Sequence, residues 1–156
     1  FPAVRPLPAA DPPEPAGLFA AVPGVGLHEV VIECPHHESD PARLTDAAFA
    51  HVFRAYRERL AALSADPRVA AVTVFKNVGA EAGASLAHLH SQIVATPIVP
   101  DALRAELDGA AAYHRAVGRC VFCDVVTAET AAGVRVVAAT PGFVAVTPFA
   151  GRFAYE

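Results

Sequence analysis

The sequence predicts an α+β fold in which an antiparallel sheet packs against helices, on three observations. Residues 28–33, 69–75 and 86–96 are rich in β-branched and apolar side chains, which is typical of strands. Residues 45–64 and 101–117 place their apolar side chains at helical spacing instead. The chain has 156 residues, of which 54% are hydrophobic, so it can bury a core.

The N-terminal segment is rich in proline, because residues 1–23 hold seven of the fourteen prolines. Proline excludes a helix interior or a central strand there. Apolar residues are spread along the segment, and we expect them to anchor an extended arm. The expected anchors are Phe1, Val4, Leu7, Leu18 and Phe19.

The first strand, His28 to Glu33, leads through a loop to a helix. We expect Thr45 to cap that helix and the helix to run to about Ser64. Its predicted apolar face consists of Ala48, Val52, Phe53, Tyr56, Leu60 and Leu63. The apolar, β-branched run Val69 to Phe75 predicts a central strand, which should form a hairpin-like pair with the strand that follows.

The segment 85–96 carries the strongest chemical signal. If a strand begins near Leu86, the side chains of His88, His90 and Gln92 project from the same face. The glycine-rich loop 77–85 precedes them, and its small residues would let a bulky anion approach backbone N–H groups. A phosphate cradle beside two imidazoles indicates attack of histidine on phosphorus.

The second part of the chain begins with a helix predicted over Asp101 to Val117, which Gly118 ends. The pair Cys120-x-x-Cys123 follows. Two short strands, Val134 to Ala139 and Phe143 to Thr147, should be joined by a Pro-Gly turn.

Composition excludes several classes of protein. A formal net charge of -4 without a Lys/Arg cluster argues against nucleic-acid binding. No apolar run reaches the roughly 20 residues of a membrane span, and no signal-peptide pattern opens the chain. Three cysteines do not form a disulfide framework, which favours the reducing cytoplasm. The chain opens on Phe1 and has no methionine, so we expect a piece of a longer protein.

The motif Asn77, Gly79, Gly83, Ser85, His88-x-His90-x-Gln92 resembles that of the galactose-1-phosphate uridylyltransferase family, a branch of the histidine-triad superfamily. The opening Phe-Pro-Ala-Val and the loop Pro35-His36-His37-Glu38-Ser39 resemble further segments of the family, and the similarity extends with compatible spacing to the last residue. The resemblance implies a histidine-triad-like fold truncated at both ends. It implies a first domain at 1–100, a connecting helix at 101–118 and the start of a second repeat at 119–156.

The resemblance also implies roles for individual residues. His90 would be the nucleophile, and Gln92 would hydrogen-bond the transferred phosphoryl group. Asn77, Gly79, Gly83 and Ser85 would contact the substrate. The implied reaction transfers UMP between UDP-glucose and galactose 1-phosphate through a nucleotidyl-histidine, and the partners are a nucleotide sugar and a sugar 1-phosphate. The resemblance further suggests a homodimer with sites completed across the interface.

Zinc is the implied metal. His37 and His88 would be two ligands of one structural site, although His36 could stand in register instead of His37. Cys120 and Cys123 would be half of a second site; the alternatives are two buried thiols or a redox pair. Structural zinc normally takes four protein ligands, so neither site is complete within this chain.

Imidazole suits this chemistry because it is a strong nucleophile that is neutral at pH 7. As the ring of His90 gains positive charge, its other N–H needs an acceptor, for which a carbonyl of the glycine loop is a candidate. Gln92 can donate a hydrogen bond but cannot shuttle a proton at neutral pH. It therefore favours transfer over hydrolysis.

Other functions remain open from the residues. Leu89 stands where the family usually has proline between the two histidines, which leaves open an ADP-sugar or dinucleoside polyphosphate phosphorylase or nucleotidyltransferase. A non-catalytic nucleotide-binding or zinc-stabilised module belongs to a different class. A metallohydrolase is disfavoured because no glutamate follows His90 at a suitable distance. His28, His51 and His114 are interpreted as surface or packing residues.

Overall fold

A computed structural model describes residues 3–8, 18 and 21–153 of the chain. It forms two compact units, Phe1–Pro100 and Asp101–Glu156. The expected anchors Phe1 and Phe19 lie outside the described residues.

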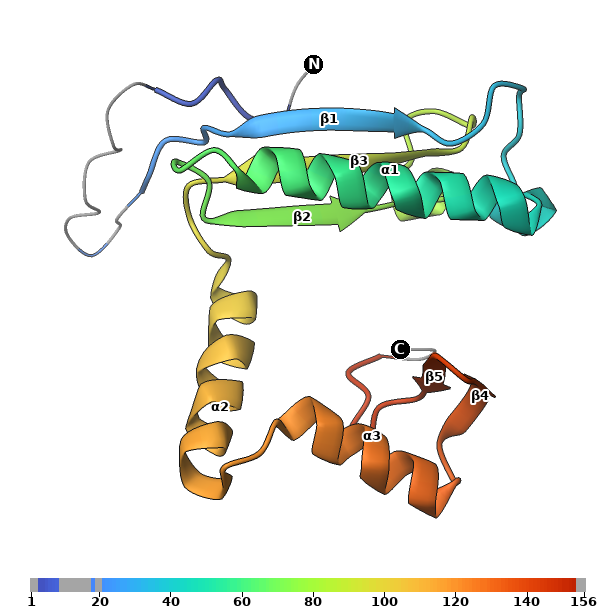
Figure 1. Cartoon of the computed structure of the whole chain (residues 1–156). Coiled ribbons are helices and arrows are strands. Elements are labelled where there is room, and N and C mark those ends of the chain that lie inside the picture. Colours follow the sequence, from blue (N-terminus) through green and yellow to red (C-terminus); the bar gives the residue numbers. More distant parts are fainter. Residues whose placement is uncertain (1–2, 9–17, 19–20, 154–156) are drawn as a thin grey trace. The chain divides into compact units, whose positions relative to one another are not determined.

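The first unit is built on a three-stranded antiparallel sheet (Figure 1). Its strands are β1 (Leu27–Ile32), β2 (Ala71–Phe75) and β3 (His90–Thr96), in the order β1-β3-β2. The strand predicted at 69–75 is therefore an edge of this sheet and not its centre. β3 is central because it pairs with both neighbours, and the predicted pairing of β2 with β3 is confirmed.

Helix α1 (Asp46–Ser64) lies over one face of the sheet (Figure 1). The hydroxyl of Thr45 accepts a hydrogen bond from the amide of Ala48 at 3.2 Å, as expected of an N-cap. Leu63 of α1 packs with Ile93 and Ala95 of β3 in the core.

The apolar face of α1 differs from the prediction at two residues, Phe53 and Phe49. Phe53 is 64% exposed, whereas Val52 is buried and Phe49 packs near Leu44. Successive residues on a helix are turned by about 100°, so a face centred on Val52 leaves Phe53 beside it.

Strand β3 presents two chemically different faces. Ser91, Ile93 and Ala95 are fully buried on the side of α1. His90 and Gln92 alternate with them and lie on the opposite face. There they are paired in register with Ile32 and Val30 of β1, which are 56% and 50% exposed.

β3 begins at His90 and not near Leu86, so the prediction that His88 lies on the strand is wrong. The segment before it forms a short 3-10 helix, η2 (Ala80–Ala82), with positive φ at Gly79 and Gly83. The amide of Leu89 then donates to the carbonyl of Glu38 at 2.8 Å. This bond joins the segment to the loop that follows β1, which includes the 3-10 helix η1 (Pro41–Arg43).

The described part of the N-terminal arm runs beside the sheet. Arg5 forms a parallel bridge with Val25, and Gly26 approaches the carbonyl of Ala95 so closely that a Cβ would lie 2.2 Å from that oxygen. Leu18 is 89% exposed and is not an anchor.

The second unit contains α2 (Asp101–Val117), α3 (Val121–Ala132) and a hairpin of β4 (Val136–Thr140) and β5 (Phe143–Val146). Gly118 follows α2 with a φ of 76°, as a helix end requires. The sequence reading did not include α3. No helix in the described part of the chain combines the length and the apolar character needed to cross a lipid bilayer.

Candidate active site

The ring of His90 is held in one tautomer. Its Nδ1 lies 2.8 Å from the carbonyl oxygen of His88, which can only accept a hydrogen bond. In the neutral ring the proton is therefore on Nδ1, and Nε2 keeps its lone pair. The acceptor belongs to His88 and not to the glycine loop, so the prediction is right in kind and wrong in position.

The free nitrogen of His90 remains accessible although the residue is only 5% exposed. Among the described residues, no buried side-chain nitrogen or oxygen lacks a hydrogen-bond partner. Because Nε2 has no partner in that part of the chain, it must keep a path to solvent. A lone pair with such a path can attack an electrophile.

Gln92 is hydrogen-bonded to His28, which the sequence analysis interpreted as a surface or packing residue and not as part of the site. Nε2 of His28 lies 2.9 Å from Oε1 of Gln92, and the amide of Ala3 donates to Nδ1 of His28 at 3.0 Å. In the register of β1 and β3, Val30 is opposite Gln92, so His28 is a diagonal neighbour on the same face. Side chains alternate between the two faces of a strand, so His28 could have been identified as a neighbour of Gln92 once the register of β1 and β3 was known.

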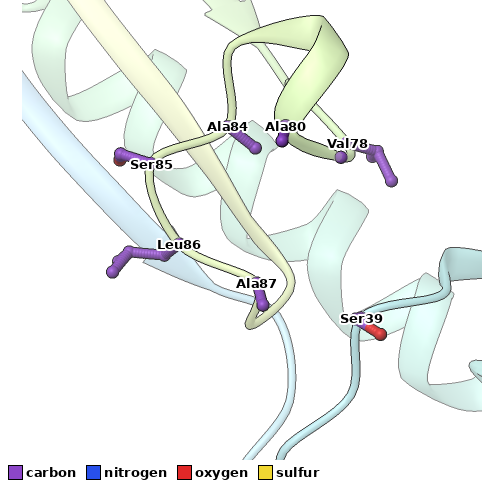
Figure 2. Close-up of a pocket in the computed structure, with 8 residues that line it drawn as sticks. Ser39, Val78, Ala80, Ala84, Ser85, Leu86 and Ala87 are labelled. Atoms are coloured by element: carbon purple, nitrogen blue, oxygen red, sulfur yellow. The ribbon is translucent and has the colours of Figure 1, made fainter.

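The glycine loop borders a hollow of about 320 Å³ (Figure 2). Gly79 and Ser85 are among the loop residues that line it. Ser39 lies across the hollow from Ser85 (Figure 2). The amides of Gly83 and Ala84 donate to carbonyls within the loop, so these two are not available to an anion.

Four of the predicted substrate contacts, Asn77, Gly79, Gly83 and Ser85, belong to this loop, and two of them, Gly79 and Ser85, line the hollow. The side-chain nitrogen of Asn77 lies 3.9 Å from where a Cβ of Gly83 would be. His90 and Gln92 are not among the residues that border the hollow. The structure thus describes an accessible imidazole and a small-residue hollow as separate features of the first unit.

The two predicted zinc-ligating histidines come together. The rings of His37 and His88 are in edge-to-face contact with centroids 5.6 Å apart, so His37 is the member of the His36–His37 pair that meets His88. Nε2 of His88 lies 2.9 Å from the carbonyl oxygen of Cys34, which places the proton there and leaves Nδ1 as the possible ligand atom. The thiol of Cys34 is buried and lies 3.8 Å from the same Nε2.

Cys120 and Cys123 lie in the second unit, where Cys120 is the N-cap of α3. Both are exposed and free, so the alternative of two buried thiols is wrong. Hydrogen bonds from the backbone amides of Cys123 and Phe122 lower the pKa of Cys120, whereas its hydrogen bond with Cys120 raises the pKa of Cys123. A thiol with a lowered pKa is suited to metal binding. Within the described residues, no three His, Cys, Asp or Glu side chains are grouped as a metal site.

A buried polar cluster lies on the α1 side of the sheet, next to His90 in sequence. Glu33 accepts hydrogen bonds from the hydroxyls of Ser91 and Tyr56 and pairs with Lys76 at 2.5 Å. Burial raises the pKa of Glu33, but the hydrogen bonds from Lys76, Ser91 and Tyr56 outweigh burial and hold the pKa below 4.5. Lys76 is thus an ion-pair partner and not a solvated charge. The cluster holds the side chain of Ser91, the residue that directly follows His90 on β3.

Comparison with known proteins gives a consistent result. The family model described as galactose-1-phosphate uridyl transferase, N-terminal domain, matches residues 1–100. An ADP-glucose phosphorylase of Arabidopsis thaliana is 33% identical over 140 residues, which is 90% of this chain and 38% of that protein. A galactose-1-phosphate uridylyltransferase of Thermotoga maritima is 29% identical over 150 residues, or 94% of this chain and 46% of that protein.

Solved structures agree with these relatives. The structure of a uridylyltransferase mutant superimposes with a TM-score of 0.80 at 32% sequence identity, and the match covers 92% of this chain and 48% of that one. The chain therefore spans less than half the length of the proteins it matches.

Proposed function

Because the chain belongs to the galactose-1-phosphate uridylyltransferase family, we propose that it supplies the nucleophile of a nucleotidyltransferase that acts on a nucleotide sugar. One observation carries the proposal: His90 has its proton on Nδ1 and an accessible lone pair on Nε2. The same ring would become positively charged on reaction, and the carbonyl of His88 is already in place to accept its N–H.

The proposed first half-reaction is an attack of Nε2 of His90 on the α-phosphorus of the nucleotide sugar. The N–P bond forms as the bond from phosphorus to the bridging oxygen breaks, and that oxygen leaves on the sugar 1-phosphate. In the second half-reaction, a different sugar 1-phosphate attacks the same phosphorus and releases His90, which gives ping-pong kinetics. Gln92 donates to a phosphoryl oxygen as negative charge develops in each step.

For the substrates we propose UDP-glucose and galactose 1-phosphate. Support comes from the family model and from the Thermotoga maritima relative. A second candidate is a phosphorylase of ADP-glucose. It is supported by the Arabidopsis thaliana relative, which is 33% identical to this chain over the aligned residues. Both reactions use His90 in the same way and differ in the nucleotide and in the second substrate.

Trapping of the covalent intermediate tests the function. Protein expressed from the complete gene is incubated with UDP-glucose or ADP-glucose, each labelled at the α-phosphate, and then digested. We expect acid-labile label on the peptide that carries His90, from the nucleotide sugar that is the substrate. His90→Asn should abolish it, whereas His51→Asn, an exposed position on α1, should not. Nucleotide binding without label would support a binding module instead.

Zinc is proposed as a structural metal of the whole protein. Imidazole and thiolate are zinc ligands, and the contact of His37 with His88 and the lowered pKa of Cys120 fit that use. Each pair supplies half of a tetrahedral set.

We further propose that the whole protein is a homodimer in the cytoplasm. The three cysteines of this chain are free, which accords with a reducing compartment.

A further inference from the structure

We propose that His28 is a positioning residue that sets the orientation of the Gln92 amide and thereby keeps its NH₂ group directed at the transferred phosphoryl group. The inference rests on the proposed function, because it assigns the device that prepares Gln92 for it. It arises from two hydrogen bonds to the two nitrogens of a single ring.

The tautomer of His28 follows from its first partner. The backbone amide of Ala3 can only donate, and it lies 3.0 Å from Nδ1, so Nδ1 is the acceptor. A neutral ring with an unprotonated Nδ1 carries its proton on Nε2. Nε2 of His28 is therefore a donor.

The orientation of Gln92 follows from that donor. An N–H at 2.9 Å requires an oxygen opposite it, so the carbonyl end of the Gln92 amide faces His28. The NH₂ end must then point away from His28. Within the described residues no acceptor is bonded to this NH₂ group, and it lies on the same sheet face as His90, two positions along β3.

Without His28 the amide could turn by 180° about its last torsion, which is broad for glutamine. Its oxygen would then face the phosphoryl oxygens, and two acceptors would repel each other. The two hydrogen bonds that link Ala3, His28 and Gln92 prevent this rotation. They also connect the N-terminal arm to Gln92 through His28, a residue of β1.

The substitutions His28→Gln and His28→Asn distinguish the role of the donor Nε2 from that of the acceptor Nδ1. In His28→Gln the side-chain NH₂ reaches about as far as Nε2 and can still donate to Gln92. In His28→Asn the shorter amide can only replace Nδ1 and contact Ala3. Formation of the labelled nucleotidyl-His90 is followed at saturating nucleotide sugar, in protein expressed from the complete gene. We expect His28→Asn to slow this step about tenfold and His28→Gln to restore most of the rate, with similar dissociation constants for the nucleotide sugar.

A double-mutant cycle distinguishes positioning from a general structural role. In a Gln92→Ala background, His28→Asn should cause no further loss of rate, because the residue through which it acts is gone. His51→Ala, on the exposed side of α1, serves as the unaffected control.

Equal rates for His28→Asn and His28→Gln, or an undiminished effect of His28→Asn in the Gln92→Ala background, would overturn the inference and leave the function intact. Wild-type protein that takes up no label would overturn the proposed function, and the inference would fall with it.

Discussion

At the scale of single residues, the described site depends on where three imidazole protons lie. Backbone carbonyls fix the proton on Nδ1 of His90 and on Nε2 of His88, and a backbone amide fixes it on Nε2 of His28. In the neutral rings, His90 and His88 are left with one unprotonated nitrogen each, whereas His28 is left with one N–H donor. Because the partners are backbone groups, no second side chain has to lose conformational entropy to hold each ring.

Replacement of Gln92 tests the choice between transfer and hydrolysis. Gln92→His would place a group that can exchange protons near neutral pH beside the nucleotidyl-histidine. We expect hydrolysis of the nucleotide sugar to rise by about tenfold or more while transfer falls. Release of free nucleoside monophosphate, measured without an acceptor sugar phosphate, is the assay. Unchanged hydrolysis would contradict the role given to Gln92.

Glu33 predicts a pH dependence of stability. Its pKa in the folded protein lies below the ordinary 4.5, because the hydrogen bonds from Lys76, Ser91 and Tyr56 outweigh burial. The unfolded chain thus binds the proton more tightly, and the stabilisation is fully present above about pH 4.5 and is lost as pH falls through the folded pKa.

Glu33→Gln checks this expectation. The variant leaves Lys76 without its ion partner, and we expect it to lower the free energy of unfolding by about 2 kcal/mol at pH 7. The difference from wild type should shrink below pH 4.5, where Glu33 itself becomes neutral. Urea unfolding between pH 3 and 7 measures it, with Glu58→Gln on the exposed face of α1 as control. A difference that is constant over this range would refute the assignment.

At the scale of elements, the packing of α1 predicts which apolar residues matter. Leu63→Ala removes a buried side chain that contacts Ile93, and it should cost about 3 kcal/mol of unfolding free energy. Phe53→Ala deletes a larger side chain but should cost less than about 1 kcal/mol, because that ring is mostly exposed. Chemical denaturation of both variants gives the comparison. A greater loss for Phe53→Ala would show that the helix face is wrong.

The sequence predicted the elements well where the pattern is local. The cap at Thr45, the ends of α1 and α2, and the β4–β5 hairpin follow from side chains within a few residues. The central position of β3 was not predictable in this way, because it depends on pairing between segments far apart in sequence.

The candidate site was predictable in its residues but less so in its contacts. The His88-x-His90-x-Gln92 pattern correctly placed His90 and Gln92 on one face of a strand that follows the glycine loop. Strand periodicity placed His88 on β3, whereas the bond from Leu89 to Glu38 delays the strand by several residues. His28 was interpreted as a surface or packing residue because its partner is 64 residues away, and only the register of β1 and β3 brings the two together.

At the scale of the whole molecule, the two units predict two independent zinc half-sites. His37 and His88 belong to the first unit, and Cys120 and Cys123 belong to the second. The helix that places Cys120 at its N-terminus, α3, was missed because its 12 residues are apolar on several sides and lack a clear helical stripe.

Metal content tests this division. In protein expressed from the complete gene, we expect His88→Ala to lower the bound zinc by about one ion per chain, and Cys123→Ser to remove a different one. The double variant should lose both, as measured by elemental analysis after dialysis against a chelator. His114→Ala, an exposed position on α2, should change nothing. Zinc that is unaffected by either single variant would contradict the proposal.

Along β3, buried core residues alternate with the residues of the candidate site, so one strand register places both sets. A slip of a single residue against its neighbours would turn Ile93 outward and bury His90 beneath α1. The same error would remove Ile93 from the core and bury the proposed nucleophile, so a mispaired chain would lose both its stability and the proposed reactivity. A single packing pattern on β3 therefore makes the stability of the first unit and the exposure of His90 depend on the same register.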